Sequence, residues 1–472
     1  MAMHTTHPVS ALPTAPPRET TGHLLLRAWC VVVLVLALGG VGVVHAIGPT
    51  AAGVVALASA VVSGAVWASI RPPVALRRLP FLAFGYVAWA GLSIIWSAWP
   101  AASLLTWLLL VVTTLQGLFI GAVLTWRDVV GAVASAAKWI VASSLLFELA
   151  VALFVRGPLL PGFVMAESDA DPIAPWSAGN LFDGGPLRGI FGNADLLGAV
   201  MVVAIIVFGI RYAARAPRRS LLWGWIAVAA FLFFRAGSVT AVVAAAFVAL
   251  VLATVLVMRT ARRPGERTRW YVLYALIGVG GGAALWFGRE GIFGLLGRGA
   301  DLTGREGVWA DVLARADQHP ILGWGFSTPW LASEPVIDGW IVDNGQTVVQ
   351  AHSMWLDAYF QLGGVGVVLL ALVFLAYVWR SWFFAIDRPR WDLRDDRPYS
   401  PLTLLPTLIG ALLVVQGLTD SAPLLLWGWL FVVLFGAKIK QSPLVGVGPA
   451  EQSIAIERGE FHAALVANRR RP

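Results

Sequence analysis

Long apolar runs, separated by short polar stretches, dominate the pattern of this chain. A helix needs about 20 mainly apolar residues to cross the hydrocarbon core of a bilayer, and about twelve runs approach or exceed that length. The pattern therefore predicts an all-α polytopic membrane protein with about 12 transmembrane helices. These are expected at residues 24–46, 50–70, 80–97, 103–125, 130–154, 193–212, 221–235, 239–258, 271–288, 354–378, 402–418 and 422–438.

Two long polar connections stand out, at residues 155–191 and 289–352. The second holds about 60 residues, which is long for a loop and enough for a small, partly helical subdomain. It also has material for a core in Trp309, Trp324, Trp330 and Trp340. The predicted organisation is an N-terminal tail (1–22), helices 1–9 with the first long loop (23–288), the second long loop (289–352), helices 10–12 (353–438) and a C-terminal tail (439–472).

Charge gives the predicted bundle an orientation. Only 13% of residues are charged and 58% are hydrophobic, and the net charge is +8. The basic residues gather in short loops, which is the pattern of cytoplasmic loops and argues against nucleic-acid binding. They include Arg71, Arg77, Arg78, Arg211, Arg215, Arg218, Arg219, Arg259, Arg262, Arg263, Arg267 and Arg269. With twelve crossings, both termini are cytoplasmic and both long loops are extracytoplasmic. The one cysteine, Cys30, allows neither an internal disulfide nor a cysteine metal site.

The stretch DLTGREGVWADVL carries the first candidate site. Thr303 and Glu306 have the spacing of a capping box, which places Arg305 in the first turn of a helix. Free backbone amides and the helix dipole favour an anion at that end. Arg305 is therefore expected to bind a phosphate group, unless it bends back to a loop carboxylate such as Asp301.

A second stretch, PLRGIFGNADLLGAVMV, precedes the sixth predicted helix. Asn193 suits the N-cap position of that helix. Gly189 and Gly192 allow a sharp bend or a close approach to a ligand. Arg188 runs against the charge trend of the outer side, so it is expected either to bind a ligand or to lie as a snorkelling arginine at the interface.

A third stretch, AHSMWLDAYFQLGGVG, opens the tenth predicted helix. Histidine titrates near neutral pH, which makes His352 a candidate general base, and Tyr359, seven residues on, is expected on roughly the same face. The glycines of LGGVG are expected to permit close packing within the bilayer. The preceding QHPILGWGF is expected to form a structural turn, with His319 as a loop residue.

Other polar residues are less specific. Arg235 and Asp420 fall at short outer turns and could line a site. Asp169 and Asp171 spell D-x-D, but on the outer side a solvated loop is expected rather than a metal site. Lys138 and Glu148 lie within the fifth predicted helix, where ionisable groups are suspected of function, but their spacing does not place them on one face.

Together these stretches resemble the O-antigen ligase and O-antigen polymerase superfamily of bacterial membrane glycosyltransferases. The likeness rests on Arg188 with GIFGNADLLGA, on Thr303-Gly304-Arg305 with Trp309, on HPILGWGF and on AHSMWLDAYFQLGGVG. SIIWSAWPAASLLTWLL and GLTDSAPLLLWGWL extend it over roughly residues 80 to 438. Two departures are an acid, Asp195, where the family often has Asn-Pro-Asn, and Arg235 placed before Ser238 rather than after it.

The resemblance implies transfer of a glycan from an undecaprenyl-diphosphate carrier to an acceptor hydroxyl, on the outer face of the bacterial cytoplasmic membrane. Arg188 and Arg305 would stabilise the leaving diphosphate and His352 would be the base, with inversion and with no metal or other cofactor. Substrate contacts are expected from Asn193, Arg235, Thr303, Trp309, Tyr359 and Asp420. The expected partners are the lipid-linked donor, a glycan, lipid or protein acceptor and the bilayer.

Three alternatives remain open from the sequence. A polysaccharide polymerase or a protein O-oligosaccharyltransferase would use the same site with another acceptor. A twelve-helix secondary transporter belongs to another class and predicts binding groups at the membrane midplane and an internal repeat. The chain shows no such repeat, and its candidate residues gather at one side.

Overall fold

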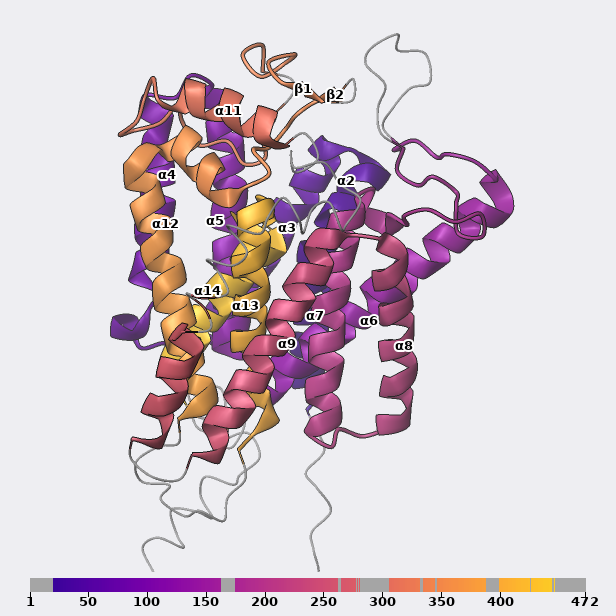
Figure 1. Cartoon of the computed structure of the whole chain (residues 1–472), viewed down its shortest axis with the longest axis vertical. Helices are drawn as coiled ribbons and strands as arrows, with labels where there is room; N and C mark the ends of the chain where they lie inside the picture. The colour runs from indigo at the N-terminus through magenta and orange to yellow at the C-terminus, as the bar shows by residue number, and fades with distance from the viewer. Residues whose placement is uncertain are drawn as a thin grey trace, which may run out of the picture.

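A computed structural model describes residues 20–162, 175–261, 265–276, 278, 280, 305–331, 334–343, 346–387, 399–424, 426–443 and 445. The chain is a helical bundle with a small layer of loops and one helix above it (Figure 1). The predicted all-α class is confirmed. Within the described residues, nine helices are long and apolar enough to cross a membrane.

The helices follow the predicted runs closely. The first half contains α1 (Thr21–Leu38), α2 (Gly40–Ile47), α3 (Pro49–Ile70), α4 (Phe81–Leu92), α5 (Pro100–Val123) and α6 (Trp126–Ala150). The second contains α7 (Ala194–Ala213), α8 (Arg219–Ala236), α9 (Val239–Thr260), α11 (Arg305–Ala316), α12 (Met354–Ile386), α13 (Leu404–Thr419) and α14 (Leu426–Gln441). Two short strands, β1 (Val342–Asp343) and β2 (Gln346–Thr347), pair in antiparallel fashion in the upper layer.

Short helical turns complete the chain. They are η1 (Leu76–Arg78), η2 (Ser93–Ile95), the π-turn η3 (Val151–Val155), η4 (Gly189–Phe191), η6 (Pro401–Thr403) and η7 (Ala422–Leu424). Three predicted helices differ from the structure. Residues 24–46 form two helices that meet at Gly39, and the tenth helix runs on to Ile386. Residues 266–276 are helical, but much of the predicted 271–288 helix lies outside the described residues.

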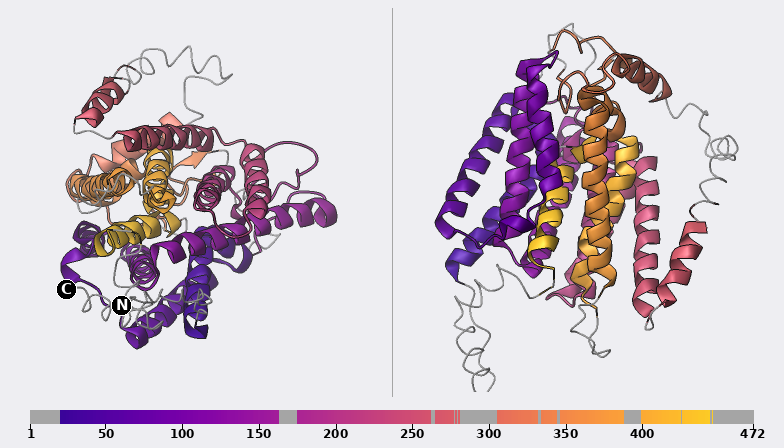
Figure 2. Two further views of the ribbon diagram at one scale, coloured as in Figure 1. Left: turned by 90° about the horizontal axis from the view of Figure 1, so that it is seen from below. Right: turned by 90° about the vertical axis from the view of Figure 1, so that its left-hand side faces the viewer.

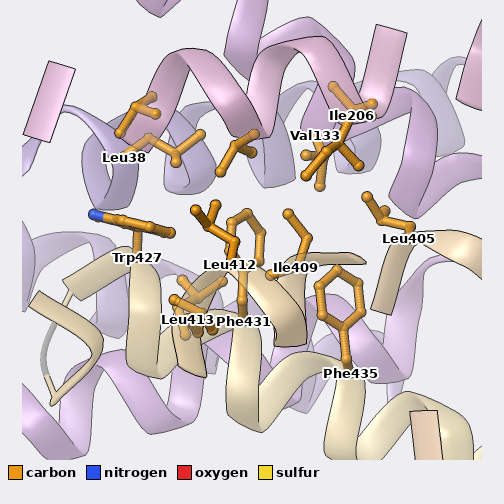
Figure 3. Close-up of a cluster of buried hydrophobic side chains, with 14 of the residues drawn as sticks. Leu38, Val133, Ile206, Leu405, Ile409, Leu412, Leu413, Trp427, Phe431 and Phe435 are labelled. Carbon is orange, nitrogen blue, oxygen red and sulfur yellow. The ribbon is translucent and has the colours of Figure 1, made fainter. Parts of the chain in front are cut away.

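The centre of the bundle is built from α13 and α14. Leu405, Ile409 and Leu412 of α13 face residues of α1, α6 and α7, while Phe431 and Phe435 of α14 lie behind them (Figure 3). All five of these side chains are fully buried, and α14 is enclosed along nearly its whole length. A helix surrounded by protein need not match the bilayer thickness, which explains why α14 is short.

Small residues let the helices approach closely, as expected where lipid supplies no hydrophobic drive between helices. Gly117 of α5 lies against the backbone of α14, and a Cβ there would come within 2.9 Å of the Leu430 carbonyl oxygen. Gly198 of α7 packs on α9, where a Cβ would come within 2.6 Å of the Ala241 methyl group.

The two ends of the bundle differ in charge. One end holds the start of α7, α9 and α12, the end of α13 and the α11 layer, and is called the site end here. The other, the basic end, holds basic residues in the last turn of α3, α7, α9 and α14 or just beyond it: Arg71, Arg211, Arg215, Arg259 and Lys440. The described residues of the two long loops near α7 and α11 lie at the site end, and the basic residues named above lie at the opposite end.

Helix α12 is broken at Gly363, whose φ of 63° and ψ of −167° are not helical. A break frees carbonyl and amide groups that must find other partners in a buried setting. The turn of residues 318–326 supplies them. Its Trp324 and Gly325 amides donate to the Phe360 and Gln361 carbonyls (3.0 and 2.9 Å), and its Pro320 and Ile321 carbonyls accept from Gly364 and Val365 (2.8 and 3.4 Å).

This turn is therefore structural, as predicted, and His319 stacks edge-on against Trp324 with ring centroids 4.3 Å apart. The glycines of LGGVG do allow close packing, but against this turn rather than another membrane helix: a Cβ on Gly363 would collide with the Ile321 carbonyl. The first two turns of α12 are thus fixed to the upper layer.

The upper layer has a core of its own. Val308, Val312 and Ala316 of α11 pack with Trp330 and Phe360. Trp340 joins them, with its ring centroid 5.1 Å from that of Phe360 and 5.4 Å from that of Trp330. Three of the four tryptophans named from the sequence, Trp324, Trp330 and Trp340, thus belong to a core, whereas Trp309 is not among its residues. They hold α11 and the start of α12 in one unit.

Candidate active site

Arg305 begins α11, in the first turn where it was expected. Its Nη2 lies 3.5 Å from Oδ2 of Asp195, in the first turn of α7. Asp195 also accepts a hydrogen bond of 2.5 Å from the Ser238 hydroxyl at the N-cap of α9. Two residues of this prediction lie outside the described residues: Asp301, the alternative partner of Arg305, and Thr303, the predicted capping residue.

The Arg305–Asp195 ion pair is long, and both of its side chains are partly exposed to solvent. The arginine side chain is 21% exposed and the carboxylate 38% exposed. An exposed ion pair contributes about 0–1 kcal/mol to stability. An anionic ligand could therefore replace Asp195 as the partner of the Arg305 guanidinium at a small cost in free energy. Asp195 is also the acid that departs from the family pattern, and the ion pair gives it a role at rest.

Asp420 joins this charged group from the end of α13. Burial and the nearby Asp195 raise the pKa of its carboxyl, while Arg305 acts in the opposite direction. The Asp420 carboxylate accepts the Ala422 amide at 3.2 Å and so begins the short turn η7. The structure thus brings together two residues singled out from separate parts of the sequence, Arg305 and Asp420.

A buried carboxylate that the sequence analysis did not single out, Asp357, lies beside this cluster. It is 1% exposed in the first turn of α12. It accepts the Ser421 hydroxyl, the Ala351 amide at 3.3 Å and a Gln361 amide hydrogen at 3.4 Å. The signal was an ionisable residue inside an apolar run, MWLDAYF, which is a functional suspect by default.

The Asp357 network connects three of the quoted motifs. Gln361 uses its side-chain oxygen to accept the Ser327 amide and the Thr328 hydroxyl, both at 2.9 Å. The residues following HPILGWGF, the start of α12 and the turn after α13 are therefore joined through one carboxylate and one amide. Each position is fixed relative to the others by buried hydrogen bonds, which hold more rigidly than exposed ones.

His352 lies just before α12 in a left-handed backbone conformation, with a φ of 50°. The residue that precedes it, Ala351, is held at both of its backbone polar groups: its amide donates to Asp357, and its carbonyl accepts the Trp309 indole at 2.9 Å. Trp309 stands one turn after Arg305 on α11. His352 and Arg305 are thus carried by elements that contact each other directly.

The imidazole itself is half-buried, and its Nδ1 lies 3.4 Å from the Gln350 side-chain nitrogen. Tyr359 was predicted to share a helix face with His352. This prediction does not apply, because α12 begins at Met354 and His352 lies before the helix. The Tyr359 hydroxyl instead donates to Asp317 at 2.8 Å, which ties α12 to the end of α11.

Arg188 belongs to a neighbouring group organised by Glu148, at the end of α6. The Glu148 carboxylate is fully buried. Its Oε1 accepts the amides of Arg188 and Gly189 at 3.0 and 2.7 Å, and its Oε2 accepts the Ser177 hydroxyl at 2.7 Å. The Arg188 side chain donates to the Pro175 carbonyl at 2.7 Å. Glu148 therefore sets the backbone from which the Arg188 side chain projects.

The bend after Arg188 uses the predicted glycines, with φ values of 55° at Gly189 and 66° at Gly192. Protein atoms fill the space beside both: a Cβ on Gly192 would come within 2.6 Å of the His45 ring, and one on Gly189 within 2.9 Å of Leu197. Of the two roles considered, the sharp bend is the one observed. Asn193 then caps α7 as predicted, accepting the Leu196 amide at 3.0 Å.

Arg235, at the end of α8, is used by the outer loop. Its Nη2 donates to the carbonyls of Asn180 and Leu181 at 3.0 and 3.1 Å, and its own carbonyl accepts the Leu187 amide at 2.8 Å. It thus supports the segment leading to Arg188. The Arg188 group and the Arg305 group meet through residues 188–195 at the start of α7, not by a direct bond between the arginines.

Part of the chain matches a known protein family. The family model described as O-antigen ligase covers residues 226–371, from the second half of α8 to the part of α12 just beyond the break. The matched region contains Arg235, Arg305, Trp309, His352 and Tyr359, while Arg188 and Asp420 lie outside it. No curated protein matches the chain.

Proposed function

We propose that the chain is a membrane glycosyltransferase of the O-antigen ligase superfamily, which moves a glycan from an undecaprenyl-diphosphate carrier to an acceptor hydroxyl; the match of residues 226–371 to the O-antigen ligase family model supports this proposal. The observation that carries the proposal is the pair of hydrogen bonds that hold the backbone of Ala351. It sets His352 next to the helix that begins with Arg305. A titratable imidazole and a partly exposed guanidinium are therefore carried by neighbouring elements at one end of the bundle.

The roles follow from the charges that the reaction creates. The acceptor oxygen attacks the anomeric carbon, the bond from that carbon to the diphosphate oxygen breaks, and the electron pair leaves with the lipid diphosphate. Arg305 is proposed to bind that diphosphate, since a guanidinium offers two parallel donors to phosphate oxygens. Arg188 is proposed to assist from the neighbouring group. The proton of the attacking hydroxyl passes to His352.

Asp195 has a defined part in this scheme. It occupies Arg305 at rest, through a contact of 3.5 Å, and it would give way to the diphosphate. Its retained bond to Ser238 keeps the displaced carboxylate near the site. Direct displacement predicts inversion at the anomeric carbon.

The orientation is proposed from charge. The basic end carries the residues that positive-inside statistics assign to the cytoplasm, so the site end would face outward and both termini inward. The polyprenyl chain would remain among the helices while the glycan lies in water. A lipid, a growing polysaccharide or a protein side chain could each supply the hydroxyl to the same base, which covers ligase, polymerase and protein-glycosylating activity.

The test is release of undecaprenyl diphosphate by the purified chain supplied with a lipid-linked glycan extract and an acceptor fraction. His352→Ala and Arg305→Ala are expected to abolish release. His319→Ala is the matched control, because this histidine lies in the same layer and loses only its ring contact with Trp324. Folding is monitored by thermal unfolding.

Equal release by the wild type, His352→Ala and Arg305→Ala would remove both residues from the reaction. Glycan length in the product separates the acceptors: a single transferred unit supports a ligase, and a ladder supports a polymerase. Substrate-dependent uptake into proteoliposomes with no release of diphosphate would favour the transporter reading instead.

A further inference from the structure

A groove at the basic end lies far from the residues of the proposed reaction. It is formed where the first turn of α4 meets the lower parts of α12 and α14, and it encloses a cavity of about 180 Å³. These three helices lie together at the left of Figure 1, and the right-hand view of Figure 2 shows α14 beside α12. The basic groove is defined by Phe81, Leu82, Val373, Arg380, Gly436 and Lys440.

Two cations stand at this groove. Arg380 is exposed, and within the described part of the chain no hydrogen bond or ion pair to a carboxylate involves it. The Lys440 ammonium donates to the Leu79 carbonyl and lies 5.5 Å from the centre of the Phe81 ring, so its charge is held in place but not neutralised. In the described residues that line the cavity, none is acidic.

The remaining wall is apolar. Phe81 is 57% exposed and Leu82 is 38% exposed, although both lie on an apolar helix of the membrane bundle. Gly436 leaves open space, since a Cβ there would meet nothing within 4 Å. A ligand that satisfied the whole groove would need a negative head next to Arg380 and Lys440 and an apolar tail along α4 and α12.

The start of α4 reinforces this charge. It has no acidic residue in its first turn and no side-chain cap, so the positive end of the helix faces the same space. Basic pockets between membrane helices at the cytoplasmic side suit anionic lipid head groups, which a membrane supplies in excess.

We infer that the basic groove binds an anionic phospholipid of the leaflet at the basic end, with its phosphate between Arg380 and Lys440 and an acyl chain against Phe81 and Leu82. This site is independent of the proposed reaction, because it is built from the opposite end of the bundle. Its occupant would anchor α4 to α12 and α14.

The experiment is native mass spectrometry of the full chain in detergent with phosphatidylglycerol or phosphatidylcholine. Wild type is expected to retain phosphatidylglycerol in preference. Arg380→Gln is expected to weaken that binding about fivefold, since one basic residue near a membrane surface contributes about that factor. Gly436→Leu, which fills the open space without altering charge, is expected to weaken it as well.

Arg127→Gln is the matched control: it removes an exposed arginine at the same end, outside the groove, and is expected to bind as wild type does. The inference is overturned if both lipids bind equally, if Arg380→Gln binds as tightly as wild type, or if Arg127→Gln weakens binding as much. It is also overturned if soluble glycerol phosphate binds as tightly as the lipid, because the apolar wall would then contribute nothing.

Discussion

Glu148→Ala is expected to be among the most damaging single changes outside the proposed reacting groups. It removes the carboxylate that accepts the amides of Arg188 and Gly189 and the Ser177 hydroxyl. A buried donor left without an acceptor costs about 1–3 kcal/mol. The two amides alone therefore predict a loss of roughly 2–6 kcal/mol, a large part of the stability of a typical domain.

Glu148→Gln is the informative comparison. The two amides both use Oε1, and a glutamine keeps an oxygen there. The loss is then confined to the weaker bond of a neutral acceptor, about 1 kcal/mol, since bonds to ionised groups are roughly twice as strong. The negative charge is absent in both variants, so the difference between them reports the hydrogen bonds and the packing of the side chain rather than its charge.

Two measurements follow from this pair of variants: thermal unfolding in detergent, and release of undecaprenyl diphosphate at a temperature where each variant is folded. If Glu148 acts by positioning Arg188, Glu148→Ala loses release as Arg188→Ala does, and Glu148→Gln recovers most of it. An alanine variant with the unfolding midpoint and rate of wild type would refute the reasoning. A glutamine variant as damaged as the alanine variant would show that the charge itself is required.

Three further outcomes are expected. Gly363→Ala should lower stability by about 1–3 kcal/mol in thermal unfolding, because φ is 63° and a Cβ would collide with the turn of residues 318–326; unchanged stability would mean that the break is not needed. Asp195→Asn should strengthen binding of inorganic pyrophosphate up to about fivefold in calorimetry, since the competing pair contributes about 0–1 kcal/mol, and weaker binding would contradict a resting role for that pair. Asp420→Asn should gain stability relative to wild type as pH rises from 3.8 towards neutrality, because the raised pKa means that the folded state favours the protonated form and loses that advantage as the carboxyl ionises. The gain is at most about 1.4 kcal/mol per unit of pKa shift, and a parallel pH dependence in the two proteins would refute it.

The membrane helices could be predicted because apolar length is a direct physical requirement of the bilayer. The runs at 50–70 and 239–258 match α3 and α9 within a few residues. What apolar length does not report is where a helix bends. Gly39 divides the first run and Gly363 interrupts the tenth, and each break depends on partners distant in the sequence.

In the candidate site, too, some residues could be predicted from the sequence and others could not. Arg305, His352 and Asp420 could be selected because charged groups beside apolar helices need a reason, and the structure places Arg305 with Asp420. Asp357 and Glu148 act through buried hydrogen bonds to segments up to 64 residues away in the sequence. Residue spacing along one helix cannot predict such partners. Tyr359 was assigned by helical periodicity to the face of a residue that precedes the helix.

The break at Gly363 also has a consequence for how the protein can be recombined. The turn of residues 318–326 replaces four backbone bonds of α12, so the first two turns of that helix are covalently part of a membrane helix but structurally part of the layer above it. The turn and α12 as far as Val365 should therefore be exchanged between relatives as one cassette, residues 305–365. A chimera joined between the turn and Gly363 would pair one protein's carbonyls with another's amides, whereas a junction in the regular helix beyond Val365 would leave every donor with its own acceptor.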